Sequence, residues 1–295
     1  MGEGRIIMKC TGSTTLEYVR TVIRQRPEDV HKGQCGRVLI AAGSKGMAGA
    51  AVLACRGAIK SGAGLVKAAV PDEILDIVQI AVPQATCMDI NDEISAGSLR
   101  IYGAIGAGPG LGTDEKRYVL IKQILKFYDG TVVLDADGLN LLCRFDDRLS
   151  ALRSRTNPTV LTPHPGEADR LLEALGKSSV KELGRIEAAE TLAEDTGAVV
   201  LLKGSGTLVS QSGKGTYINT SGNPGMATGG SGDVLTGVVT ALAASGADAF
   251  DAARAGAFVH GTAGDIAAER LGQWGMTSVD IENALPEAFR RIVGR

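Results

Sequence analysis

Residues 223–237 combine small side chains with one acid in a spacing that suits phosphate chemistry. Residues 229–232 carry little or no side chain, and Asp233 follows them at the head of an apolar run. A helix that begins here presents unpaired backbone N–H groups and the positive end of its dipole to an anion. Small residues let a phosphate approach those groups closely. The predicted anion hole consists of Gly229, Gly230, Ser231 and Gly232.

Asp233 would stand beside the bound anion, where a carboxylate can accept the proton of an attacking hydroxyl. We therefore predict that Asp233 is the catalytic base of a phosphoryl transfer. The alternative is a glycine-rich turn in which Asp233 is an ordinary helix N-cap.

Two further loops carry polar side chains directly after apolar runs. In residues 162–167, two prolines hold His164 in an extended loop that can contact a polar ligand. Glu167 in the next helical turn either interacts with the helix dipole or holds a water of Mg²⁺. In residues 203–207, Lys203 could meet a phosphate while the glycine backbone lies under a nucleotide, or the segment is only a hairpin.

Other candidate positions are less specific. Asp135 and Asp137 stand at the end of an apolar run, which suits carboxylates linked to magnesium, although Asp137 could instead cap a helix. Residues 106–112 miss the G-x-G-x-x-G pattern because Leu111 replaces the third glycine, so this loop either approaches a ligand or is a turn. We interpret His260 as a packed or interface histidine and not as a catalyst.

Composition excludes several classes of function. A net charge of −2 gives no electrostatic footprint for nucleic acid or an anionic membrane. The five cysteines are widely spaced without metal-site patterns and fit reduced thiols in the cytoplasm. Residues 1–5 show no signal peptide, and no stretch of about 18 apolar residues predicts a membrane span. P-loop, zinc-protease and Ser-His-Asp patterns are absent from the sequence.

The elements that must position these loops alternate between strands and helices. Apolar runs predict strands at residues 38–42, 65–70, 103–108, 131–135, 158–162 and 198–202, and a small antiparallel pair at 207–209 and 216–218. Helices are predicted at residues 15–23, 48–61, 72–81, 113–127, 166–175, 180–196, 232–244, 248–271 and 278–293. This alternation predicts an α/β fold with a mostly parallel sheet between helices, and loops that converge on one cleft at the carboxyl ends of the strands.

Seven segments occur in an order that resembles a known family: residues 31–33, 43–51, 108–112, 135–140, 161–167, 203–207 and 223–237. Together they resemble the ADP/ATP-dependent NAD(P)H-hydrate dehydratases, which have a ribokinase-like, three-layer α/β/α fold. Residues 230–233 alone also resemble the glycine–acid motif of many ribokinase-like kinases.

The resemblance implies a repair reaction on the (6S) hydrates of NADH and NADPH. The family phosphorylates the hydroxyl of the hydrated nicotinamide ring from ADP or ATP with Mg²⁺, and loss of phosphate restores the dihydropyridine. The implied hydrate contacts are Ala50, Gly110, His164 and Asp233. The implied nucleotide contacts are Lys203, Gly204, Ser205, Gly206, Thr207 and Gly232.

The resemblance also suggests the organisation of the chain. It begins near residue 31, so we divide the chain into an N-terminal helical extension (residues 1–30) and a single dehydratase domain (residues 31–295). The extension is too short for the epimerase domain often fused to such enzymes, so we expect the epimerase as a separate chain. The small-residue helices at residues 48–61 and 248–271 could form the interface of a homo-oligomer, with a tetramer as one candidate.

Two rival functions share part of this pattern. A small-molecule kinase of the same fold, of the thiazole or pyrimidine kinase type, would use Asp233 and the anion hole but release a stable phosphorylated product. The His164 loop and residues 43–51 favour the dehydratase. A nucleotide-binding regulatory module is less consistent with the sequence, because a binding protein needs no base at Asp233.

Overall fold

The computed structural model describes residues 10–92 and 96–294. Residues 1–9 of the predicted N-terminal extension, including the segment judged to lack a signal peptide, lie outside the described residues. No helix in the described ranges is both long enough and apolar enough to cross a membrane.

A single sheet with the strand order β1-β10-β9-β8-β7-β6-β5-β2-β3-β4 forms the centre of the described chain. All neighbouring strands run parallel except β9, which is antiparallel to both β8 and β10. The strands are β1 (Gly12–Ser13), β2 (Arg37–Ala41), β3 (Leu65–Val70), β4 (Thr86–Asp89), β5 (Ala104–Ala107), β6 (Thr131–Leu134), β7 (Thr159–Leu161), β8 (Val199–Leu202), β9 (Leu208–Gln211) and β10 (Gly215–Ile218).

The helices connect these strands and continue to the C-terminus. The α-helices are α1 (Leu16–Val22), α2 (Ala48–Lys60), α3 (Asp72–Ala81), α4 (Ala96–Leu99), α5 (Glu115–Phe127), α6 (Asp137–Phe145), α7 (Ser150–Arg153), α8 (Pro165–Ala174), α9 (Val180–Leu183), α10 (Arg185–Thr196), α11 (Ser231–Ala244), α12 (Ala249–Leu271) and α13 (Ser278–Val293). Two short 3₁₀ helices are η1 (Asp147–Leu149) and η2 (Pro224–Met226).

The predicted mostly parallel α/β sheet and its antiparallel pair are confirmed, with several differences in single elements. Strands β1 and β4 were not predicted, because β1 has only two residues and β4 carries polar side chains. Helix α6 and the four-residue helices α4 and α7 were also not predicted. The predicted helix at residues 180–196 is divided into α9 and α10 at Gly184, which has a φ of +85°.

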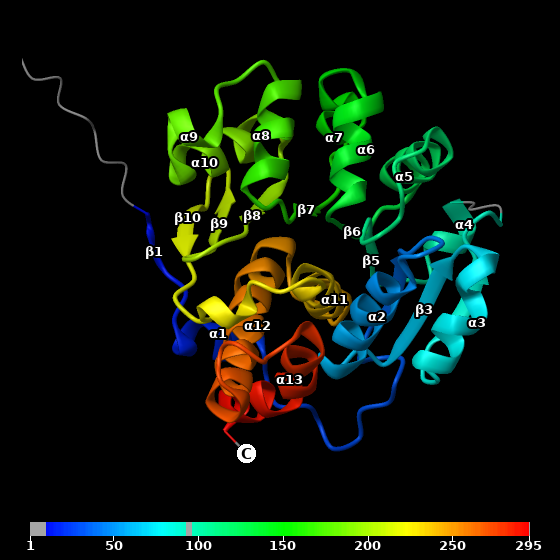
Figure 1. The fold of residues 1–295 in the computed structure, drawn as a ribbon, viewed down its shortest axis with the longest axis vertical. Coiled ribbons are helices and arrows are strands. Elements are labelled where there is room, and N and C mark those ends of the chain that lie inside the picture. The colour runs from blue at the N-terminus through cyan, green and yellow to red at the C-terminus, as the bar shows by residue number, and fades with distance from the viewer. Residues whose placement is uncertain (1–9, 93–95, 295) are drawn as a thin grey trace, which may run out of the picture.

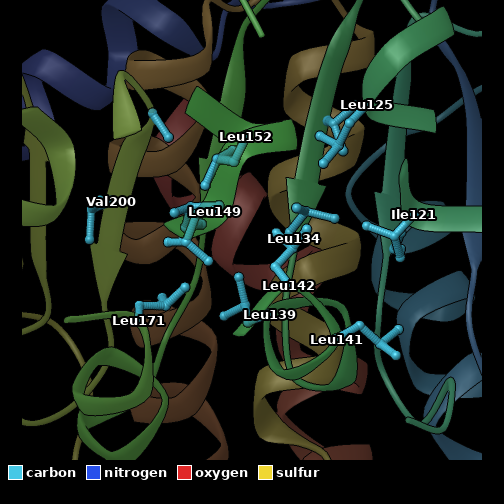
Figure 2. Packing of buried hydrophobic residues seen from close by; sticks show 14 of the residues in the cluster. Ile121, Leu125, Leu134, Leu139, Leu141, Leu142, Leu149, Leu152, Leu171 and Val200 are labelled. Carbon is cyan, nitrogen blue, oxygen red and sulfur yellow. The ribbon is translucent and has the colours of Figure 1, made fainter. Parts of the chain in front are cut away.

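The helices form a layer on each face of the sheet (Figure 1). Helices α5 to α10 cover one face, and α1, α2, α11, α12 and α13 lie on the other. On the first face, Leu134 of β6 packs among Leu139 and Leu142 of α6 and Leu171 of α8 (Figure 2). The apolar strands are therefore buried on both sides, as their continuous apolar sequences predict.

Helices α2 and α11 cross so closely that glycine is required at the contact. A Cβ on Gly237 would lie 2.1 Å from the carbonyl oxygen of Ala54, and one on Gly57 would lie 2.6 Å from that of Val234. This crossing fixes the position of α11, whose first turn contains Asp233.

Residues 10–23 pack onto the rest of the chain. Strand β1 pairs with β10, and α1 contacts α12 and α13. The guanidinium of Arg254, on α12, lies 3.6 Å from the ring centre of Tyr18 and 3.7 Å from that of Tyr217. The hydroxyl of Tyr18 donates a hydrogen bond to Asp251. The proposed division of the chain at residue 30 remains a prediction.

Candidate active site

The candidate site lies at the carboxyl ends of the parallel strands. Strands β2, β5, β6, β7 and β8 all run parallel, so the loops that follow them emerge at one edge of the sheet. These loops contain the candidate residues Gly110, Asp135, His164 and Lys203, and Ala50 lies in the first turn of α2, directly after the loop that follows β2. Ligands of open α/β sheets commonly bind at this edge.

Lys203 is the central cation of the site. Its Nζ lies 2.6 Å from Oδ1 of Asp135 and 3.7 Å from Oε2 of Glu167. Burial lowers the pKa of Lys203, but the carboxylates of Asp135, Glu167 and Asp233 more than offset this effect and raise the pKa above its ordinary value. The charged ammonium group therefore holds together the ends of β6 and β8 and the start of α8.

Asp135 is a buried anchor whose role the sequence left open. Its side chain is almost fully buried, and its second oxygen accepts a hydrogen bond of 2.9 Å from the hydroxyl of Thr236 on α11. A Cβ on Gly232 would lie 3.2 Å from Nζ of Lys203, so a glycine here lets α11 approach the ion pair. Nothing in the sequence signals the contribution of Thr236, because it reads as one more residue of an apolar helix.

Asp233 occupies the third position of α11 and is not its N-cap, which is Gly230. The alternative that Asp233 is an ordinary cap is therefore wrong. Burial raises the pKa of Asp233 to about 7, with a further increase from the Asp135 carboxylate and an opposing decrease from Lys203. A carboxyl group with this pKa can both take up and release a proton near neutral pH.

The turn before α11 has the conformation that an anion hole needs. Gly230 has a φ of +86°, and a Cβ there would lie 2.4 Å from Cδ1 of Leu53 and 2.8 Å from Oγ of Ser278. By contrast, a Cβ on Gly229 would meet no atom within 4 Å. The turn is thus packed tightly on one side and open on the other.

The first amides of α11 are available to a ligand. The N–H of Val234 donates to the carbonyl oxygen of Gly230 at 3.2 Å and closes the first turn. The N–H groups of Gly232 and Asp233 precede this bond and have no partner within the helix, as at every helix start. The role of residues 229–232 in phosphate binding remains a prediction that this geometry favours.

The glycine loop after β5 is tied to its neighbours. The N–H of Gly112 donates to Oδ2 of Asp137 at 2.8 Å, and Gly43 N–H donates to the carbonyl oxygen of Pro109 at 2.8 Å. A Cβ on Gly110, which has a φ of +58°, would lie 2.9 Å from Cβ of Ala50. The structure therefore brings Ala50 and Gly110 together, as the family resemblance implies.

Asp137 connects this loop to Asp233. Its carboxylate is one of the charges that raise the pKa of Asp233. It does not cap α6, because the N-cap is Ala136 and no side-chain cap bond is present. Ala136 has a φ of +47°, an uncommon conformation for a residue with a side chain. The strained residue directs Asp135 toward Lys203 and Asp137 toward Gly112.

His164 and Glu167 form a capping box at the start of α8. Nδ1 of His164 accepts hydrogen bonds from the N–H groups of Gly166 and Glu167, and the N–H of His164 donates to Oε2 of Glu167 at 2.8 Å. The His164 ring is half exposed, whereas Glu167 is buried. His164 is thus held in one orientation and remains accessible to a ligand.

The loop of residues 203–207 connects the antiparallel strands β8 and β9. Glycines with positive φ, Gly204 at +137° and Gly206 at +62°, shape this loop. Arg185 of α10 donates to the carbonyl oxygen of Ser205, and Thr207 donates to that of Gly204 at 3.0 Å. The loop is both a hairpin and part of the site edge. No motif in the sequence marked Arg185 as a residue that contacts this loop.

His260 packs inside the chain beneath the start of α11. It is 7% exposed, and its Nε2 lies 3.5 Å from Oγ of Ser231. Burial lowers the pKa of His260 to about 4, so the ring is neutral at physiological pH. The interpretation of a packed histidine is confirmed.

The carboxylates around Lys203 could bind a magnesium ion together with the phosphates of a nucleotide. Within residues 10–92 and 96–294, no three His, Cys, Asp or Glu side chains are arranged to hold a metal ion. Mg²⁺ commonly binds through one or two carboxylates, waters and substrate phosphates. Glu167 and Asp233 both lie near the ammonium group of Lys203, and their carboxylates fit such an arrangement.

The fold and the glycine–acid helix start define a ribokinase-like protein. A ribokinase-like superfamily protein of Enterococcus faecalis has a structure with a TM-score of 0.80 to this one, at 26% identity, covering 95% of this chain and 96% of that chain. The family model for NAD(P)H-hydrate dehydratase matches residues 38–287. The chain belongs to the NAD(P)H-hydrate dehydratase family.

Two named relatives agree with this assignment. The chain is 39% identical over 253 residues to an ADP-dependent (S)-NAD(P)H-hydrate dehydratase of Neisseria meningitidis, covering 85% of this chain and 83% of that protein. A Bacillus subtilis ADP/ATP-dependent NAD(P)H-hydrate dehydratase, crystallised with ATP and Mg²⁺, has a TM-score of 0.84 at 28% identity and covers 97% of this chain and 99% of that chain. The chain spans about half the length of the bifunctional NAD(P)H-hydrate repair enzymes that it also matches.

Proposed function

We propose that this protein is a hydro-lyase that restores NADH and NADPH from their (6S) hydrates at the expense of ADP or ATP. The observation that carries the proposal is Asp233, a carboxyl group with a pKa of about 7 in the first turn of α11, which follows the open side of Gly229. Membership of the dehydratase family supports the choice of substrate.

In the proposed reaction, the terminal phosphoryl group of the nucleotide lies at the amides of Gly232 and Asp233. The ring hydroxyl attacks phosphorus as the bond to the leaving nucleotide breaks, and Asp233 receives the hydroxyl proton. The C–O bond of the ring then breaks, phosphate departs with the bonding electrons, and loss of a ring proton restores the dihydropyridine. Because the transition state is loose, positioning and charge stabilisation supply most of the catalysis.

The other residues position the two substrates. We assign Ala50, Gly110 and His164 to the hydrate, and residues 203–207 with Gly232 to the nucleotide. Support comes from the contact of Ala50 with Gly110 and from the exposed, oriented ring of His164. Lys203 holds Asp135 and Glu167 in place and adds positive charge near the transferred phosphate.

Mg²⁺ would enter with the nucleotide, and Glu167 would hold it through a water molecule. When bound, the ion would neutralise charge on the nucleotide phosphates. The Bacillus subtilis relative, which was crystallised with ATP and Mg²⁺, supports the entry of Mg²⁺ with the nucleotide.

We further propose the setting in which the enzyme acts. Its five thiols are free, which suits the reducing cytoplasm. An epimerase activity that interconverts the two hydrate epimers would supply the (6S) hydrate. The small residues of α2 and α12 are largely buried within this chain, so a homo-oligomer, for example a tetramer, would use other surfaces, such as exposed Ile77 and Ile80 of α3.

Incubation of hydrated NADH with Mg²⁺ and either ADP or ATP tests the activity. We expect the absorbance of reduced nicotinamide to recover, with one phosphate released for each NADH formed. A small-molecule kinase would convert the nucleotide without recovering NADH, and a binding module would do neither. The absence of recovery with both nucleotides would contradict the proposal.

A further inference from the structure

A cavity of about 700 Å³, here called the second cavity to distinguish it from the candidate active site, lies between α6, α8 and the loop before α5. Its size falls within the range of roughly 300–1,000 Å³ that is typical of small-molecule sites. The residues around it are Thr113, Asn140, Cys143, Arg144, Arg170, Glu173 and Ala174. None of them was among the predicted site residues.

Two arginines give this cavity its positive charge. Nε of Arg170 donates to Oδ1 of Asn140 at 3.0 Å, and Nη1 of Arg144 donates to the carbonyl oxygen of Thr113 at 3.3 Å. These bonds hold both stems at the cavity, and both side chains are exposed. The terminal nitrogens of Arg170 have no acceptor among the described residues.

The remaining groups reduce this charge only in part. Glu173 contributes one carboxylate that opposes the two arginines. Burial raises the pKa of Cys143 to about 11, so the thiol is neutral and does not repel an anion. The cavity therefore keeps an excess of one positive charge, carried by planar donors that suit bidentate phosphate binding.

The cavity is continuous with the elements that carry the hydrate contacts. Helix α8 begins beside His164, and Arg170 lies six residues further on, which is about 9 Å along the helix axis. On the other side, Asp137 at the start of α6 binds Gly112 of the glycine loop, and Thr113 follows directly. The cavity therefore lies along the same helix and loop that carry His164 and Gly110.

We propose that Arg144 and Arg170 bind the 2′-phosphate of the NADPH hydrate and make the enzyme prefer it over the NADH hydrate. This inference rests on the proposed function, because it places the reacting ring at Asp233 and the adenosine ribose in the second cavity. NADH hydrate lacks the 2′-phosphate and gains nothing from the arginine pair. Glu173 limits the preference by repelling the same phosphate.

Steady-state kinetics with both hydrates test the preference. We expect Arg170→Gln and Arg144→Gln each to lower kcat/KM for NADPH hydrate about tenfold, equivalent to ~1.4 kcal/mol, mainly through KM. In the same two variants, kcat/KM for NADH hydrate should change less than about twofold. The control is Arg153→Gln, which replaces an exposed arginine of α7 outside the cavity. In this control, kcat/KM for either hydrate should change less than about twofold. Glu173→Gln should have the opposite effect and lower KM for NADPH hydrate.

An equal loss for both hydrates would overturn the proposal, because the cavity would then bind a group that both share. Unchanged kinetics in the two cavity arginine variants would also overturn it.

Calorimetry with NADP⁺ and NAD⁺ separates this inference from the proposed activity, since neither ligand is turned over. Tighter binding of NADP⁺ that is lost in Arg170→Gln supports the phosphate site even if the hydrate assay fails. If the enzyme is active but binds NADP⁺ and NAD⁺ equally well, the 2′-phosphate site is contradicted while the proposed function stands.

Discussion

At the scale of single residues, the site depends on a cluster of acids that share one buried cation. Lys203 neutralises Asp135 directly and Glu167 less closely, at 2.6 Å and 3.7 Å. Asp233 has no such direct ion pair, and its pKa rises to about 7 because it is buried close to Asp135. The same residue type is therefore an anchor at position 135 and a candidate base at position 233.

The raised pKa of Asp233 predicts the pH dependence of catalysis. The base must be ionised to accept a proton, so kcat/KM should rise with pH through about 7 and then level off. Asp233→Asn should lower turnover by roughly 10²–10⁴-fold while nucleotide binding persists. A profile that stays flat between about pH 6 and 8, or near-normal turnover of the variant, would show that Asp233 is not the base.

The same substitution has a predicted effect on stability. The folded-state pKa of Asp233 lies above its ordinary value of 3.8, so the folded chain binds more protons than the unfolded chain between these values. The free energy of unfolding contributed by this group therefore falls as pH rises from about 4 to 7. Asp233→Asn cannot ionise, so it avoids this fall in the free energy of unfolding. In thermal melts above pH 7, the Tm of the variant should be at least ~2 °C higher than that of the wild type.

At the scale of elements, the start of α11 decides whether the site can form. The contact of α11 with α2 fixes the helix, and Gly230 turns the chain into it with a φ of +86°. On the open side, Gly229 has free space next to its Cα. The two adjacent glycines thus differ: the conformation and packing at Gly230 require a glycine, whereas the space beside Gly229 is open to the proposed phosphate.

Alanine substitutions at these two glycines should separate stability from binding. Gly230→Ala places a Cβ against Leu53 and Ser278 in a strained conformation, so it should reduce the free energy of unfolding by about 1–3 kcal/mol. Gly229→Ala should leave the melting temperature unchanged but weaken nucleotide binding, because its methyl group enters the proposed phosphate space. Denaturant unfolding and calorimetric titration of both variants measure the two effects. Equal destabilisation by both would contradict this distinction.

At the scale of the whole molecule, the N-terminal segment is part of the packed structure. Arg254 is 5% exposed and lies between the rings of Tyr18 and Tyr217, while its Nε donates to Oγ1 of Thr14 at 3.3 Å. One side chain of α12 therefore joins α1, β10 and the residue after β1.

Replacement of Arg254 should loosen this segment. Arg254→Ala removes the desolvated cation–π contacts with Tyr18 and Tyr217 and a longer one with Phe250, so the free energy of unfolding should fall by about 2 kcal/mol or more. Amide hydrogen exchange in residues 16–22 should become faster than in α11. Arg290→Ala removes a surface ion pair with Glu287 and serves as control; the Arg290 side chain is 60% exposed, so the expected change is below about 1 kcal/mol. Unchanged exchange in α1 would mean that other contacts hold the segment.

The sequence by itself determined most of the parallel sheet and the positions of the loops, because buried strands read as continuous apolar runs and glycines mark close approaches. The motifs in residues 161–167, 203–207 and 223–237 were recognisable because their chemistry is local in the chain. Strands β1 and β4 were not recognisable, because their polar or very short sequences become strands only when a neighbouring strand is present.

Only the tertiary structure decided how the charges interact. Asp135, Lys203 and Thr236 are far apart in the chain, so no spacing rule connects them. The pKa of Asp233 depends on its burial and on the positions of Asp135 and Lys203. The cavity with Arg144 and Arg170 likewise exists only because α6 and α8 pack side by side. Local sequence thus specifies which side chains lie in the loops of the site, while long-range packing sets their burial, distances and charge.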